Sequence, residues 1–567
     1  MPEKHSNDAV TGEPAVDQRR LLSRRGLLKM SLVGGGALIV GPGLLAACGS
    51  EGSDTGGSST APGSVTGGTS PSGSAPATGA SPSAGGGAGG GGGGGEITVG
   101  VVTDMANFDP YYNGTVNFIQ MQNLNEFLID YDDKLTAKPA ALTKWELNSD
   151  NTSITLTLRE NVKLQTGKTW TVDDLIAGFK RAADPDQGQQ LNGPMAIVKD
   201  YKAIDDHTVE LTFTSPVAEL LVTDLLESFP IVDKDKNSSD DLATKPASGG
   251  PFQLASRDPG NNLVITRWPD FWNAQAVSLD KATFRIFDND DSMVSALQAG
   301  EMDVIYRFPP RHAAQLKDQF SIIEGYPGAL VDCIRINTNI APFDNIKLRQ
   351  AIARSVDRQR IVDEVYFGYG APCFLPWGPN SPANDPAYEQ KNSYDLDTAK
   401  QLLAESGAPK SAEALADGSN SDALKMLQIL QQSLSQIGFD LKINTLEAQA
   451  FRQKLLAGEF GLLFGGIGNS SKSPSRVATN SIYRTTDNPV LKDKTPKAYI
   501  DAIAASEGAI TPDAAKAAYA QLNEVLSTEC FAIPVCTSIS LIACKKNITG
   551  ITRDVDDRLV LEGVKVG

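Results

Sequence analysis

A stretch in the second half of the chain combines the patterns of a strand, a turn and a helix. From Ile334 to Ile352 it reads IRINTNIAPFDNIKLRQAI. Alternating apolar residues predict a strand over Val331–Asn337, and Pro342–Asp344 predicts a turn. The apolar spacing that follows predicts an amphipathic helix over about Ile346–Phe367, broken near Asp357. An earlier α/β pattern therefore restarts here, and a second lobe is expected to begin near residue 330.

The segments around this stretch alternate strand patterns with helix patterns. Before it, strands are expected at Ile154–Leu158 and Thr208–Phe213, and a capped helix is expected to follow Thr171. After it, Ser421–Leu446 and Ala448–Gly465 each predict a helix and a strand on a shared sheet. The sequence therefore predicts an α/β fold.

Two lobes account for the body of the chain. The first is expected over residues 96–330 and the second over residues 331–530. A final apolar strand is predicted over Phe531–Ala543.

The N-terminal residues have the three parts of an export signal. A basic segment, Ser23–Lys29, precedes a mostly apolar run, Met30–Ala47, which ends in small residues before Cys48. The pair Arg24 and Arg25 resembles a twin-arginine signal, and Leu-Ala-Ala-Cys resembles a bacterial lipobox, whose cysteine is acylated. A transmembrane helix is the alternative, but glycines and a proline interrupt the apolar run. We therefore expect residues 1–47 to be removed and Cys48 to carry the lipid.

Residues 48–95 are expected to form a flexible tether. After the cysteine they are almost entirely Gly, Ser, Thr, Ala and Pro, which cannot build an apolar core. A chain of this length spans roughly 40 Å on average. The tether would hold the body at the outer face of the cytoplasmic membrane without fixing its orientation.

Charge and cysteine usage exclude some functions. The whole chain carries a net charge of −17, which argues against nucleic acid, because phosphate binding needs concentrated Lys and Arg. Beyond Cys48, five cysteines could form at most two disulfides and would leave one thiol: Cys333, Cys373, Cys530, Cys536 and Cys544.

Six segments together resemble one known family. The opening stretch, followed by Ser355–Arg358, resembles the signature of bacterial extracellular solute-binding protein family 5, the peptide-type binding proteins of ABC importers. Five further segments match in order along the chain: Trp145 with Leu156–Leu164, Asp206–Glu210, Gly249–Phe252, Ala299–Asp303 and Ala399–Gly407. The resemblance covers about residues 96 to 545.

This resemblance implies a periplasmic-binding-protein-like fold of type II, with two lobes, central mixed sheets and a hinge. The first lobe is extended and also receives the C-terminal end, about residues 531–567. The lobes close around a ligand, expected to be a peptide, with a sugar, a metal chelate or another solute as the alternative. Such a protein is expected to be a monomer without a cofactor that delivers its ligand to ABC permease subunits.

The family's ligand segment is altered here. Oligopeptide binders carry Gly-Trp and then an Asp that binds the peptide ammonium, whereas this chain has Ile467 at the Trp position and no acidic residue before Asp487. Either another carboxylate binds the ammonium or the ligand lacks a free N-terminus, because a buried unpaired ammonium is costly. The resemblance implies these cleft residues: Gly466, Ile467, Gly468 and Asn469, with Tyr111, Tyr112 and Asn113 from the opposing lobe.

Enzymes and sensors are the competing classes. The body holds only two histidines, His207 and His312, and after residue 96 it has no Gly-x-Ser-x-Gly elbow. No His-Glu-x-x-His pattern or Cys/His cluster indicates a metal. We therefore expect no catalytic residues, although a secreted hydrolase and a sensor or adhesion lipoprotein remain alternatives.

The lipobox interpretation predicts the behaviour of Cys48→Ser. This variant should leave the membrane fraction, because it removes the acylated side chain, while its ligand affinity stays unchanged. Fractionation followed by binding measurements checks both. A Cys48→Ser protein that stays membrane-bound would contradict the interpretation.

Overall fold

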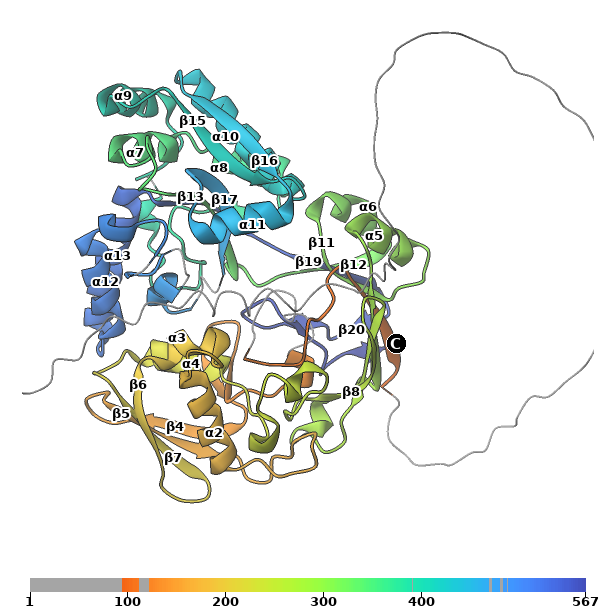
Figure 1. The fold of residues 1–567 in the computed structure, drawn as a ribbon. Coiled ribbons are helices and arrows are strands. Elements are labelled where there is room, and N and C mark those ends of the chain that lie inside the picture. The colour runs from red at the N-terminus through yellow and green to blue at the C-terminus, as the bar shows by residue number, and fades with distance from the viewer. Residues whose placement is uncertain (1–93, 112–121, 390, 469–471, 480–482, 487) are drawn as a thin grey trace, which may run out of the picture. The chain divides into compact units, whose positions relative to one another are not determined.

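Two mixed sheets organise the part of the chain described in this computed structural model (Figure 1). The described residues are 94–111, 122–389, 391–468, 472–479, 483–486 and 488–567. The expected export signal lies outside them. Among the described residues, no helix is both long enough and apolar enough to cross a membrane.

The first sheet forms the centre of lobe I. Its seven strands lie in the order β12-β19-β11-β1-β10-β9-β8, and β1 pairs in parallel with β10 and β11. The strands are β1 Glu96–Val101, β8 Phe252–Asp258, β9 Asn262–Arg267, β10 Lys281–Ile286, β11 Val304–Phe308, β12 Phe320–Glu324 and β19 Leu541–Lys545. Helices α5 (Asp290–Gln298) and α6 (Ala313–Leu316) belong to the same lobe.

A second, antiparallel sheet extends lobe I. Its order is β4-β5-β7-β6, with β4 Leu142–Leu147, β5 Ser153–Leu158, β6 Val198–Ala203 and β7 Thr208–Phe213. In β5 and β7 every second residue is buried, which confirms the two predicted strands. Helix α2 (Val172–Ala183) begins after Thr171, whose backbone N–H donates to Asp174, as predicted. The remaining elements of lobe I are α3 Asn192–Met195, α4 Glu219–Ser228, β2 Ile129–Tyr131, β3 Ala137–Pro139, β20 Ile548–Thr549, β21 Thr552–Arg553, β22 Leu559–Val560 and β23 Lys565–Val566.

Lobe II is built on a six-stranded sheet in the order β14-β18-β13-β17-β15-β16. Its strands are β13 Leu330–Ile336, β14 Gly370–Pro372, β15 Ser411–Asp417, β16 Asp440–Leu446, β17 Leu462–Gly468 and β18 Ala532–Ser538. Its helices are α7 Ile346–Arg354, α8 Arg358–Glu364, α9 Leu396–Ser406, α10 Ser421–Gln436, α11 Ala448–Ala457, α12 Lys497–Glu507 and α13 Pro512–Glu529. Strands β16 and β17 both pair in parallel with β15, which confirms the two predicted helix–strand units.

The stretch from Val331 to Phe367 forms β13, a turn and two helices. Asn345 caps α7 by accepting hydrogen bonds from the backbone N–H groups of Lys347 and Leu348, and the expected break is confirmed because Asp357 caps α8. The Arg349 guanidinium is buried, pairs with Glu529 at 2.9 Å and donates to the carbonyls that end the turn. These side chains therefore hold lobe II together.

The chain crosses between the lobes twice. Residues 325–329 connect β12 of lobe I to β13 of lobe II, and residues 539–540 connect β18 back to β19. The single final strand predicted over Phe531–Ala543 is wrong: it is two strands in different sheets. The return to lobe I therefore begins after Ser538, because β18 pairs with β13 rather than with the lobe I sheet. Two short crossings side by side are the usual form of a hinge.

The five cysteines of the body are all free thiols. Four of them are buried, and the fold is held together without disulfides.

Candidate functional site

The end of β17 reaches the edge of lobe II that adjoins the hinge. Gly468 lies opposite Leu330, the first residue of β13 after the crossing from lobe I. Gly468 is exposed and Gly466 is partly exposed, whereas the Ile467 side chain is 4% exposed and packs in the lobe II core. The structure therefore brings these three expected ligand residues together, with the two glycines offering backbone atoms.

Tyr111 lies in the core of lobe I. Its side chain is completely buried, with its ring at 6.0 Å from that of Phe229 and at 4.2 Å from the Arg181 guanidinium. Burial raises the pKa of its hydroxyl far above the usual range. In this conformation Tyr111 presents no surface to solvent. The other expected ligand residues, Tyr112, Asn113 and Asn469, lie outside the described residues, as do Arg24, Arg25 and Cys48.

A lysine that follows β17 joins the two lobes. The Lys472 ammonium is 1% exposed and lies against two carboxylates of lobe I, Glu227 on α4 and, at 2.8 Å, Asp556 near the C-terminus. The Arg558 guanidinium pairs with Glu227 and with Asp554 from the other side. Alternating charges therefore run from lobe II into the interior of lobe I.

The next residues of lobe II make a second set of contacts with α4. The backbone N–H of Ser473 donates to the Asp224 carboxylate at 2.9 Å, and Arg476 lies 3.8 Å from the same group. The Tyr131 hydroxyl lies within hydrogen-bond distance of the Asp224 carboxylate, at 3.0 Å, and of the Thr223 hydroxyl, at 2.7 Å. We call the seven charged side chains the interlobe ion cluster: Asp224, Glu227, Asp554, Asp556 and Arg558 from lobe I, with Lys472 and Arg476 from lobe II.

The cluster is electrostatically complementary across the lobes. Lobe I contributes four carboxylates and one guanidinium, and lobe II contributes two cations. Burial raises the pKa of Asp556, but the charges of Lys472 and Arg558 overcome this effect and lower it to about 2. Burial lowers the pKa of Lys472, and the carboxylates of Asp556 and Glu227 more than compensate and raise it. The Lys472–Asp556 pair is therefore ionised at neutral pH.

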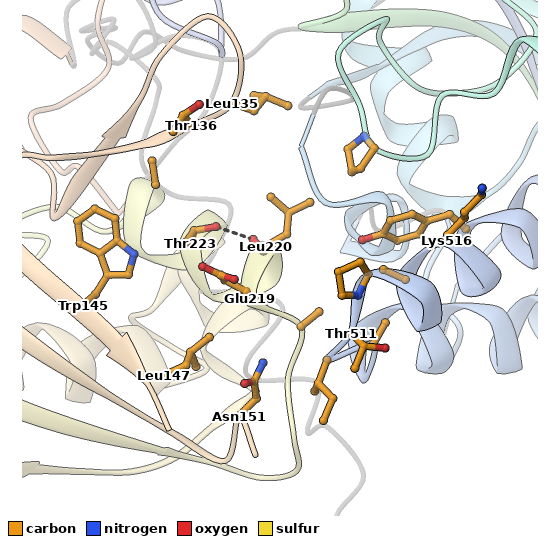
Figure 2. A pocket seen from close by; sticks show the side chains of 18 of the residues that line it. Leu135, Thr136, Trp145, Leu147, Asn151, Glu219, Leu220, Thr223, Thr511 and Lys516 are labelled. Atoms are coloured by element: carbon orange, nitrogen blue, oxygen red, sulfur yellow. Dashed lines mark hydrogen bonds between the residues drawn. The ribbon is translucent and has the colours of Figure 1, made fainter. Parts of the chain in front are cut away.

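A cavity of about 1,040 Å³ lies between the lobes and adjoins this cluster. Figure 2 shows Trp145, Glu219 and Leu220 of lobe I on one side, and Thr511 and Lys516 of lobe II on the other. Tyr131 and Thr223 belong both to the cavity wall and to the hydrogen bonds around Asp224. A mixed wall of apolar side chains and a few polar groups suits a small organic solute.

The described residues contain no group of three or more His, Cys, Asp or Glu side chains placed to hold a metal ion. Sequence reasoning missed the interlobe ion cluster, because Lys472 and its partners Glu227 and Asp556 are far apart in the chain. The charged run from Asp554 to Arg558 was the one local signal, since such a run is unusual in a buried segment.

Comparison with known protein sequences gives two findings. Residues 136–488 match the family model of the bacterial extracellular solute-binding proteins, family 5. The glutathione-binding protein GsiB of Salmonella typhi is 26% identical over 359 residues, which cover 62% of this chain and 70% of that protein.

Solved structures of similar fold carry different ligands. A dipeptide-binding protein from Pseudoalteromonas sp. SM9913 in complex with Met-Leu has a TM-score of 0.72 at 19% identity, over 83% of this chain and 100% of that one. NikA from Brucella suis in complex with Fe(III)-EDTA has a TM-score of 0.73 at 18% identity, over 83% and 100%. These likenesses confirm the predicted two-lobed fold.

The interlobe ion cluster predicts an effect of Lys472→Met on lobe closure. Without the Lys472 ammonium, the carboxylates of Glu227 and Asp556 keep only Arg558 as an ion-pair partner among the described residues, and one buried negative charge is left unpaired. Leaving a buried charge unpaired destabilises the closed form by about 3 kcal/mol. Opening hydrates these carboxylates, so the closed form should lose population by a factor on the order of 100. Small-angle scattering of the ligand-free protein should give a larger radius of gyration.

Lys497→Met is the matched control. Its side chain is 84% exposed and, among the described residues, pairs only with Asp501 on the same helix of lobe II. The scattering of this variant should therefore equal that of the wild type. Identical radii for both variants would contradict a role of Lys472 in closure.

Proposed function

The chain belongs to the bacterial extracellular solute-binding proteins of family 5, and from this premise we propose that it captures a peptide or peptide-like solute and passes it to the permease of an ABC importer. The observation that carries the proposal is the pair of lobes joined by two crossings, with complementary charge and a cavity between them. Closing such lobes encloses a ligand, and ligand contacts made only in the closed form favour closure. ATP hydrolysis belongs to other subunits, and the chain itself acts by binding rather than catalysis.

We further propose that the protein acts as a lipid-anchored monomer outside the cytoplasmic membrane. Cys48 carries the lipid, Arg24 and Arg25 direct export, and residues 48–95 tether the body. A binding protein needs both proximity to its permease and freedom to turn, and a long flexible tether supplies both. In this proposal Gly466, Gly468 and Asn469 line the ligand site together with the backbone of Ile467. Tyr112 and Asn113 are the proposed ligand residues of lobe I, and Tyr111 supports that segment from the core.

A ligand without a free ammonium is the second candidate. The lobe I carboxylates that contact the residues after β17 are already engaged, Glu227 and Asp556 by Lys472 and Asp224 by Ser473. A peptide ammonium would have to displace Lys472 or find another partner. An N-terminally blocked peptide, a sugar or a metal chelate avoids this cost.

Native mass spectrometry of gently purified protein tests the proposal. We expect a retained small molecule, and we expect thermal stabilisation by its class in a panel of di- to pentapeptides, their N-acetylated forms, sugars and metal chelates. A ligand at 100 times its dissociation constant adds about 2.7 kcal/mol to the free energy of unfolding.

The panel separates the candidates. Stabilisation by free peptides supports the first, and stabilisation only by blocked peptides or other solutes supports the second. Turnover of any of these compounds, or no retained ligand and no stabilisation by any of them, would contradict solute capture.

A further inference from the structure

Arg335 on β13 is a buried cation with few partners. Its side chain is 9% exposed, and among the described residues it forms no ion pair with a carboxylate. One terminal N–H donates to the Gly466 carbonyl, and Nε has no hydrogen-bond acceptor in the described structure. A guanidinium in this state is costly to bury, because it has lost water without gaining an anion.

The other buried arginines of the described structure are better paired. Arg181, Arg349 and Arg558 each form an ion pair with a carboxylate. Arg358 has no carboxylate, but it donates to the carbonyls of three residues at 2.9 Å: Cys373, Pro534 and Asn392. Among the described residues Arg335 therefore has no carboxylate in contact, and its one recorded charge interaction with a carboxyl group is with Asp332 on the same strand.

The position of Arg335 places its charge at the expected ligand segment. Its Cα lies opposite Leu463, whereas its guanidinium reaches the carbonyl of Gly466, which lies opposite Asp332. The side chain therefore extends along the sheet toward the hinge edge. Gly465 leaves room for it, since a Cβ there would lie 3.2 Å from Nε.

The aromatic ring of Tyr483, whose hydroxyl is a second unpaired donor, lies near this guanidinium. The Tyr483 ring centroid is 5.8 Å from Arg335 Cζ, and the Tyr483 hydroxyl is buried without a hydrogen-bond partner among the described residues. Each of these two buried donors lacks the acceptor that a buried polar group ordinarily has. An anion with two oxygens fits best, because Nε and a terminal N–H of arginine form a planar fork.

We propose that Arg335 binds a carboxylate of the captured solute at the hinge edge of β13 and β17, with Tyr483 as a further donor. This inference rests on the proposed function and adds the chemistry of one ligand group. It explains why a chain of strongly negative net charge keeps an unpaired cation beside its ligand segment: the solute brings the counter-charge.

A titration with acetate tests the site without knowledge of the natural ligand. The full-length chain is labelled with ¹⁵N, and the Arg335 Nε–H signal is identified by its loss in Arg335→Lys. Acetate should shift this signal to saturation, and chloride at equal ionic strength should not. A response no larger than that of the exposed Arg484 would overturn the inference.

Binding of Met-Leu and its C-terminal amide gives a second test. Arg335→Met should weaken the binding of Met-Leu at least tenfold and leave the amide unaffected, whereas Arg484→Met, one residue from Tyr483, should change neither. Equal binding of acid and amide by the wild type would overturn the carboxylate site and leave the proposed function intact. If neither dipeptide binds, peptide capture loses support, and the acetate titration still decides on Arg335.

Thermal unfolding of the ligand-free variants excludes a purely structural role. Arg335→Met should unfold at the same temperature as the wild type or higher, because it removes an unpaired buried charge. A large loss of stability would mean that Arg335 holds the fold together, and it would overturn the inference.

Discussion

The contact between Lys472 and the carboxylates of Glu227 and Asp556 is the constraint on which this arrangement depends. All three side chains are almost completely buried, and they come from a segment after β17, from helix α4 and from the C-terminal end. Isolated charges at these depths would cost several kcal/mol each, so each lobe needs the other in the closed form. Because leaving any one of these charges unpaired is costly, the contact favours one particular position of the lobes in the closed form.

The hinge explains how this contact can form and break. Only residues 325–329 and 539–540 cross between the two sheets. The rest of each lobe is tied within itself, for example by Arg349 and Glu529 in lobe II. A rotation at the crossings therefore separates the cluster without unfolding either lobe, and the separated carboxylates become hydrated. The free energy lost with the ion pairs on opening is largely offset by the hydration of the separated charges. A ligand of modest affinity can therefore shift the equilibrium between the open and the closed form.

Local patterns in the sequence predicted most helices and strands correctly. They could not predict the contacts between residues that are far apart in the chain. The strand before Asn337, the cap that starts a new helix at Asp357 and the helix–strand units of lobe II follow from spacing and turn residues alone. The apolar run from Phe531 to Ala543 shows the limit, since nothing local marks the point where it leaves one sheet for another. The ion cluster and the position of Arg335 were also beyond reach, because pairing of charges across hundreds of residues depends on the closed lobes. Periodicity alone predicted the two lobes, and the family resemblance supplied the hinge between them.

Hydrogen exchange at two backbone amides tests the central claim, that the lobes close and open as one event. The Ser473 amide donates to Asp224 at 2.9 Å and the Ala218 amide donates to the Glu507 carbonyl at 2.7 Å, so each hydrogen bond joins the two lobes. We predict equal opening free energies for both amides, well below that of the Ile336 amide, which bonds within lobe II. Different opening free energies at Ser473 and Ala218 would show independent local motions and would contradict concerted closure.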